Sequence, residues 1–135
     1  RGGTTPPPGG APAGARVTGD SNIGIGVNGG AVTTGFSNVG IGSSAGQGTN
    51  GAFNVALGGL SGGGVQGSAN VAIGLNAGEN VSASNTVAIG TRAKATGDSG
   101  VSIGTDASAT YANAVALGAN STTAADLAAL NANAA

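Results

Sequence analysis

The sequence predicts an all-β fold, a parallel β-roll in which about seven short coils stack on one another. The main observation is a four-residue phrase of an aliphatic residue, a small residue, an aliphatic residue and a glycine, which occurs seven times. Its copies begin at residues 23, 39, 55, 71, 87, 101 and 115, so the repeat is 16 residues long four times and 14 residues long twice. Repeats of this length are typical of stacked copies of one small unit rather than of a globular domain.

The composition is the second observation, because it limits how thick the core can be. Glycine accounts for 29 of the 135 residues, and only 2% of the residues are aromatic. Side chains this small can build a thin core that repeats, but they cannot fill a wide one. A single roll would therefore be marginally stable on its own, and we expect it to associate with further copies.

The same composition excludes several classes of function. The chain has no cysteine and no histidine, and its five acidic residues fall at different positions of their repeats, so no catalytic pair, cofactor site or metal site is predicted. Four lysine and arginine residues provide no basic patch for nucleic acid or anionic lipid. We therefore expect a protein that is not an enzyme, binds no nucleic acid and makes no membrane contact through this part of the chain.

The chain divides into three parts by composition. Residues 1–20 contain all four prolines among glycine, alanine and threonine, which predicts an extended linker. The repeats occupy residues 21–123, and the alanine-rich residues 124–135 are interpreted as a tail or a short helix. Because the sequence opens at Arg1 without a methionine, we expect it to be part of a longer protein, with any anchor outside it.

Each repeat is predicted to form one coil that begins with the strand phrase and turns at the glycine. Alternation along a strand places the two aliphatic residues on one face and the small residue between them on the other. We expect the aliphatic residues to fill the roll and Ala72, Ala88 and Ser102 to lie on the opposite face. The predicted core residues are Val71, Ile73, Val87, Ile89, Val101, Ile103, Val115 and Leu117. Replacing Ile89 by Ala would then leave a cavity and cost about 2–4 kcal/mol.

A second short strand is predicted from small residues that recur three and five positions after the corner glycine. Ala93 with Ala95, and Ala107 with Ala109, have the spacing of two that places both residues on one strand face. In three longer repeats the fifth position holds Gln47, Gly63 and Glu79. The two additional residues of the longer repeats are expected to form a loop on one edge of the roll.

Two sets of polar residues occupy equivalent positions in successive repeats. Asparagine stands directly before the strand phrase four times, as Asn22, Asn38, Asn54 and Asn70. Amides stacked in register can hydrogen-bond along the stack, so we interpret them as a structural ladder, with a ligand-contacting polar stripe as the alternative. Arg92 and Asp106 each stand two positions after a corner glycine in neighbouring repeats, which predicts a surface ion pair.

The strand phrase and its surroundings also form a longer pattern. Residues 70–74 read Asn-Val-Ala-Ile-Gly and residues 86–90 read Thr-Val-Ala-Ile-Gly, followed by Ala93, Ala95 and Gly97. This pattern resembles the YadA-like head repeat of trimeric autotransporter adhesins, approximately SVAIGxxAxAxGxxS. The resemblance covers about residues 21–123, in which the longer repeats look like variants with two inserted residues. It implies a left-handed parallel β-roll, three of which associate into a homotrimer.

The resemblance also implies a function. Heads of this kind are displayed on the bacterial cell surface, are attached to the outer membrane through other regions of the protein, and bind host cells or extracellular matrix proteins such as collagen, fibronectin or laminin. The leading hypothesis is therefore a non-catalytic adhesin head whose partner is a matrix protein or a host cell-surface receptor. The alternatives are an architectural spacer of a surface fibre, or another β-solenoid such as a phage fibre or an ice-binding protein.

Overall fold

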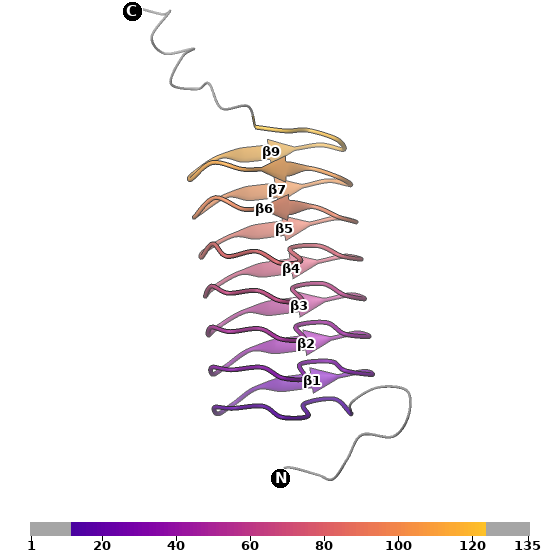
Figure 1. The fold of residues 1–135 in the computed structure, drawn as a ribbon. Coiled ribbons are helices and arrows are strands. Elements are labelled where there is room, and N and C mark those ends of the chain that lie inside the picture. Colours follow the sequence, from indigo (N-terminus) through magenta and orange to yellow (C-terminus); the bar gives the residue numbers. More distant parts are fainter. Residues whose placement is uncertain (1–11, 124–135) are drawn as a thin grey trace, which may run out of the picture.

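The computed structural model describes residues 12–123, and they form a parallel β-solenoid (Figure 1). The predicted all-β architecture is confirmed: the described residues contain nine short strands and no helix, and hence no helix long and apolar enough to cross a membrane. The tail at 124–135 and the first eleven residues of the predicted linker lie outside the described residues.

One parallel sheet runs the length of the solenoid and contains one strand from each coil. The strands are β1 (Ile23–Ile25), β2 (Val39–Ile41), β3 (Val55–Leu57), β4 (Val71–Ile73), β5 (Val87–Ile89), β7 (Val101–Ile103) and β9 (Val115–Leu117). They pair in that order, so six turns of the chain separate the first strand from the last. The pairing is in register at each step, with equivalent residues of the seven phrases directly opposite one another.

The glycine that ends each strand is required by the stacking. Gly42, for example, has φ 130°, and a Cβ placed on it would lie 2.7 Å from the carbonyl oxygen of Gly58 in the next coil. No side chain fits at that distance, and the backbone conformation is one that residues with a Cβ rarely adopt. The glycine of the phrase therefore lets successive corners stack at the spacing of the sheet.

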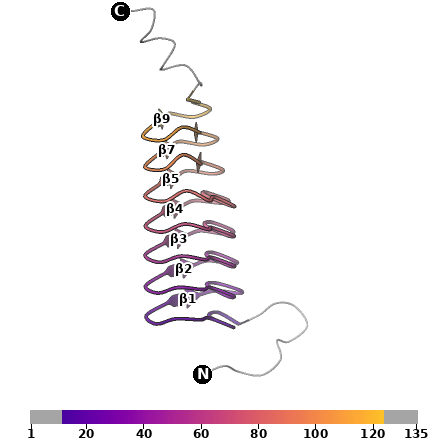
Figure 2. The ribbon, with the colours of Figure 1, turned by 60° about the vertical axis from the view of Figure 1, so that its left-hand side comes forward.

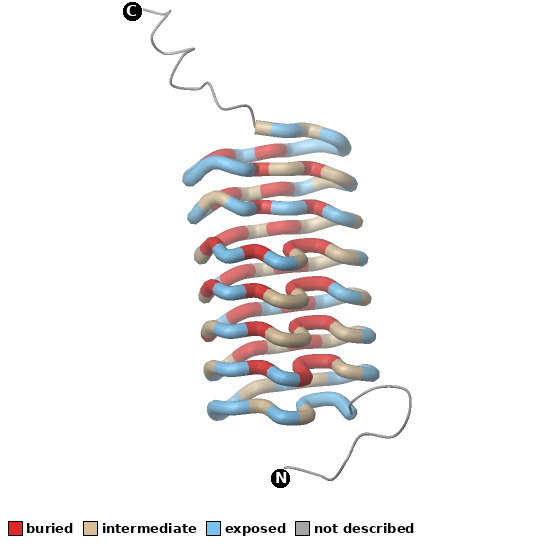
Figure 3. The backbone as a smooth tube through the Cα atoms, viewed as in Figure 1, coloured by how far each residue is buried: buried red, intermediate tan, exposed pale blue. Residues whose placement is uncertain are grey.

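Small residues line the interior of the solenoid. The central residue of each strand faces inward, and Ala56, Ala72 and Ala88 are at most 3% exposed. The opposite side contributes the fully buried residues Ala45, Ser61, Ala77, Ala93 and Ala107. The two sides are so close that a Cβ placed on Gly62 would lie 2.9 Å from the Cβ of Ala56. Figure 3 shows the buried segments recurring at the same places in successive coils.

The prediction that valine and isoleucine fill the roll was wrong. Five of the predicted core residues, Val71, Ile73, Val87, Ile89 and Val101, are only partly buried, and Ile103, Val115 and Leu117 are exposed. Ala72, Ala88 and Ser102, which were expected on the opposite face, are the buried residues of these strands. The faces are reversed because the narrow gap between the two sides accommodates alanine or serine but not a branched side chain. Ile89→Ala would therefore leave no cavity inside the roll.

The second side of the solenoid is a regular strand only in the shorter coils, as β6 (Lys94–Ala95) and β8 (Ser108–Ala109). In the longer coils the fifth-position residues Gln47, Gly63 and Glu79 are only partly buried, contrary to the prediction. The inward positions there belong to Thr33, Thr49, Val65 and Val81. The two inserted residues form an extra turn within this side rather than a loop at its edge, and Figure 2 shows it as a fold-back in the lower coils.

The solenoid also begins earlier than the predicted boundary at residue 21. The backbone N–H of Gly14 donates to the carbonyl oxygen of Gly29 at 2.9 Å, and Thr18 forms a parallel bridge with Thr34. Residues 12–20, assigned from composition to the linker, therefore form part of a coil beneath β1. Composition did not predict that residues 12–20 belong to the solenoid, because these residues contain no strand phrase. Only their backbone hydrogen bonds place them in the stack.

The narrow interior leads to a test by overpacking. Ala88 is 1% exposed at the centre of β5. Ala88→Leu should lower the free energy of unfolding by about 3 kcal/mol, because the interior has no space for three more carbons. Urea unfolding followed by circular dichroism measures the change. Ala13→Leu, at an exposed position, is the matched control and should have little effect. Equal stability of the two variants would contradict the assignment of the interior.

Candidate functional site

The most distinctive surface of the molecule is the outer face of the seven-stranded sheet. The residues that begin the strands form one ladder, Ile23, Val39, Val55, Val71, Val87, Val101 and Val115, and those that end them form a second, Ile25, Ile41, Leu57, Ile73, Ile89, Ile103 and Leu117. We call these two ladders the apolar strip. No polar side chain interrupts either ladder, and seven strands at about 4.8 Å per step make a strip about 30 Å long.

The apolar strip is exposed in the single chain. Ile23, Ile25 and Leu57 are between 44% and 55% exposed, and the end strand β9 leaves Leu117 at 70%. The middle residues are less exposed because they shield one another along the ladders. Single exposed aliphatic residues are common on proteins, but a continuous, regular patch of them is typical of an interaction surface.

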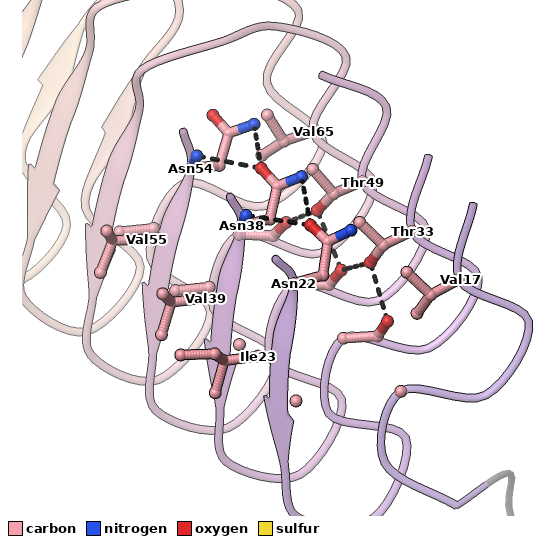
Figure 4. Close-up of a pocket in the computed structure, with 18 of the residues that line it drawn as sticks. Val17, Asn22, Ile23, Thr33, Asn38, Val39, Thr49, Asn54, Val55 and Val65 are labelled. Atoms are coloured by element: carbon pink, nitrogen blue, oxygen red, sulfur yellow. Dashed lines mark hydrogen bonds between the residues drawn. The ribbon is translucent and has the colours of Figure 1, made fainter. Parts of the chain in front are cut away.

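The four predicted asparagines form a hydrogen-bonded ladder in the solenoid, and Figure 4 shows the first three of them, Asn22, Asn38 and Asn54. Oδ1 of Asn22 accepts hydrogen bonds from the backbone N–H and the Nδ2 of Asn38, both at 3.0 Å, and Asn38 and Asn54 are joined in the same way. The backbone N–H of Asn70 donates to Oδ1 of Asn54 at 3.0 Å. Each amide therefore joins its own coil to the next one.

The asparagines also hold the two sides of the coils together. Nδ2 of Asn38 donates to the carbonyl oxygen of Gly51 at 2.8 Å, and Nδ2 of Asn54 donates to that of Gly67 at 2.8 Å. The ladder ends at Thr86, whose hydroxyl donates to Oδ1 of Asn70 at 2.7 Å. Gly100 occupies the next equivalent position, so the ladder belongs to the 16-residue coils, which are the wider ones.

Burial decides between the two interpretations of these asparagines. Asn38, Asn54 and Asn70 are between 4% and 6% exposed, so a protein ligand cannot reach their amides. The cavity beside them has a volume of only about 30 Å³ and is lined mainly by strand backbone, the asparagines and threonines such as Thr33 (Figure 4). This volume is comparable to one or two water molecules. The ladder therefore acts as internal structure and not as a ligand-contacting stripe.

Arg92 and Asp106 lie side by side on neighbouring coils. Nε of Arg92 donates to one carboxylate oxygen and its Nη2 to the other, both at 2.6 Å. The hydrogen bonds from Arg92 lower the pKa of Asp106 below its ordinary value. The stabilisation is therefore present at neutral pH and is lost as the pH falls through this lowered pKa. Both side chains are solvent-exposed, so the pair fixes neighbouring coils only weakly.

The described residues contain no cluster of side chains suited to metal binding. No group of three or more acidic, histidine or cysteine side chains that could hold a metal ion occurs between residues 12 and 123. The acidic residues of this part of the chain are distributed over different coils, as their sequence positions suggest. The surface that sequence reasoning missed is the apolar strip. Its residues were identified as one set, but they were assigned to the interior.

The asparagine ladder leads to a mutational test. Asn54→Ala would leave the backbone N–H of Asn70 and the carbonyl oxygen of Gly67 without their hydrogen-bond partners inside the solenoid. Loss of these bonds should reduce the free energy of unfolding by about 3 kcal/mol. Asn50→Ala is the matched control, because the exposed Asn50 side chain makes no hydrogen bond to a described residue. Thermal unfolding of both variants measures the difference in stability. Equal unfolding midpoints would show that the ladder does not stabilise the fold.

Comparison with known proteins places the shorter coils in a family. Residues 82–107 and 95–121 match two copies of the YadA head domain repeat. Neither the comparison with curated proteins nor that with solved structures gave a match. The matched segments span β5 to β9, and the same in-register sheet continues through the longer coils below them. The repeat matches cover residues 82–121, and together with the β-solenoid that contains them they support a YadA-like head of a trimeric autotransporter adhesin.

Proposed function

We propose that this chain is the non-catalytic head of a bacterial cell-surface adhesin that attaches the cell to host cells or to an extracellular matrix protein. The single observation that carries the proposal is the pair of YadA head domain repeats at residues 82–121. Under this proposal, regions of the protein outside this chain connect the head to the outer membrane. The solenoid itself serves as a stiff, regular surface on which weak contacts are repeated.

The assembly that we propose is a homotrimer joined along the apolar strip. Each coil contributes mainly alanine, serine and glycine to its own interior, so a single solenoid buries little apolar surface against the entropy of ordering its residues. Joining copies through the apolar strip would bury two large aliphatic side chains per coil. This argument supports association, and the number three is supported by the family to which the repeats belong.

The character of the outer surface supports adhesion through many weak contacts. No ionisable side chain occurs between Asp20 and Glu79, which spans the coils of β1 to β4. Electrostatic attraction can therefore contribute little to binding at this part of the head. Three copies of a repetitive surface instead allow several weak contacts with a repetitive ligand, and multivalency then raises the overall avidity.

The second candidate function is an architectural spacer that holds other adhesive domains away from the cell. The observation that favours it is that the cavity beside the asparagines measures only about 30 Å³ and that the described residues contain no group of three side chains that could hold a metal ion. A spacer and an adhesin head would share the same solenoid and the same trimer. They differ only in whether the isolated assembly binds host material.

The assembly is tested by a charge placed in the apolar strip. The unmodified protein should be a trimer by light scattering at micromolar concentration. Val71→Asp, in the middle of the first ladder, should dissociate it, because the carboxylate would be desolvated at the interface. Thr96→Asp, exposed on the other side of the solenoid, should leave the trimer intact. A stable monomer of the unmodified protein, or dissociation by both substitutions, would contradict the proposed interface.

Adhesion is tested by applying the purified trimer to immobilised collagen, fibronectin and laminin and to cultured host cells. Binding to at least one of them should be saturable and should persist when the salt concentration is raised, because the lower coils have no charges to screen. The Val71→Asp variant should bind more weakly through lost multivalency. Absence of binding to every matrix protein and cell type would favour the spacer.

A further inference from the structure

We propose that the edge before each strand of the apolar strip in one protomer packs against the edge after the equivalent strand in the next protomer, with Phe53 against Leu60 as the central contact. This inference rests on the proposed homotrimer and specifies its contact. The leading edge consists of residues 20–21, 36–37, 52–53, 68–69, 84–85, 98–99 and 112–113. The trailing edge consists of residues 27–28, 43–44, 59–60, 75–76, 91–92, 105–106 and 119–120. Figure 1 shows the turns stacked at both ends of the strands.

The leading edge has two large aromatic side chains, and both belong to the lower coils. Phe36 and Phe53 are 51% and 57% exposed, and their rings meet edge to face with centroids 5.0 Å apart. Phe53 has φ 59°, a left-handed conformation that is costly for a residue with a large side chain. The equivalent position higher in the stack is filled by Asn85 and Asn113, which tolerate this conformation better. The ring of Phe53 contacts that of Phe36 but remains 57% exposed in the isolated chain.

The trailing edge has exposed aliphatic side chains in the coils of β1, β3 and β4. Val27, Leu60 and Leu75 are 56%, 43% and 54% exposed. Leu60 also has a left-handed backbone, with φ 58°. From β5 upward the trailing edge becomes polar or small, with Arg92 and Asp106 among its residues, and the leading edge changes in the same way. At β3 both edges have a large apolar side chain, Phe53 before the strand and Leu60 after it, whereas at β1, β2 and β4 only one edge has one.

Ring symmetry determines which positions of the two edges meet. In a closed ring, the contact between neighbours is heterologous, so one patch meets a different patch on the next copy. Rotation about the ring axis produces no displacement along the axis, so equivalent coils of neighbouring protomers lie at the same height. The leading edge at β3 would then meet the trailing edge at β3 of the next protomer. This places Phe53 of one copy against Leu60 of the next.

The partner that covers each edge is therefore a second copy of this chain. Both edges border the apolar strip directly, since only Asn54 separates Phe53 from β3 and only two residues separate β3 from Leu60. A contact across the edges would extend the buried strip without interruption. The contact would cover the exposed apolar side chains of both edges, and Phe53 and Leu60 lie at the same height along the axis.

Cysteine cross-linking tests this arrangement sharply, because the natural chain contains no cysteine. In the variant Phe53→Cys with Leu60→Cys, the two thiols lie at opposite ends of β3 and cannot join within one protomer. Each can join only a neighbour, so mild oxidation, or a flexible bis-maleimide, should yield covalent species of three chains on a denaturing gel. Circular dichroism and light scattering on the reduced variant verify that it remains a folded trimer.

The controls separate this proposal from the trimer itself. Phe53→Cys alone and Leu60→Cys alone should give no covalent product, because like edges do not meet. Phe53→Cys with Thr105→Cys should also fail, because three strand spacings, about 14 Å, separate their levels. A trimer by light scattering without cross-linking would overturn the edge contact alone, as would efficient cross-linking of a single-cysteine variant. A protein that is monomeric before any cross-linking would overturn the proposed assembly as well.

Discussion

The structure depends on one constraint, the in-register parallel stacking of coils whose two sides lie too close for large side chains. Because each residue recurs above its equivalent, a favourable contact is repeated along the axis, and so is an unfavourable one. The corner glycine, the inward alanine and the buried asparagine each satisfy this constraint at one position of the coil. Large aliphatic residues satisfy it only on the outside. The closeness of the two sides therefore produces both the thin interior and the exposed apolar strip.

Much of the fold could be predicted from the sequence because the repeat itself carries the information. Seven copies of one phrase fix the strand positions, the register and the parallel pairing, and the spacing of Asn22, Asn38, Asn54 and Asn70 fixes their alignment. The repeat does not show which face of each strand points into the solenoid. A period of two shows that Val87 and Ile89 share a face opposite Ala88, and both faces are apolar. Only the distance between the two sides, which the sequence does not state, decides which face is inside.

The second side of the coils shows a related limit of the sequence. The residues three positions after the corner are small in all seven repeats, and they are buried in the complete coils as expected. At the position two residues further along, the longer and shorter repeats differ. A single rule that this position is buried fails at Gln47 and Glu79. The additional turn has no strong signature, because its left-handed positions are filled by glycine in some coils and by Val32 or Asn80 in others. The difference in repeat length shows where in the sequence two residues are inserted, but it does not show which part of the coil they form.

The charge-free stretch between Asp20 and Glu79 has a consequence for proton linkage. The stability of a protein depends on pH only where folding changes the number of protons that its groups bind. Residues 21–78, which include β1 to β4, contain no ionisable side chain, so folding of this stretch neither takes up nor releases protons. The ionic contacts described in the upper coils are peripheral to the interior. About half of the solenoid is therefore held together by interactions that do not depend on the protonation of side chains.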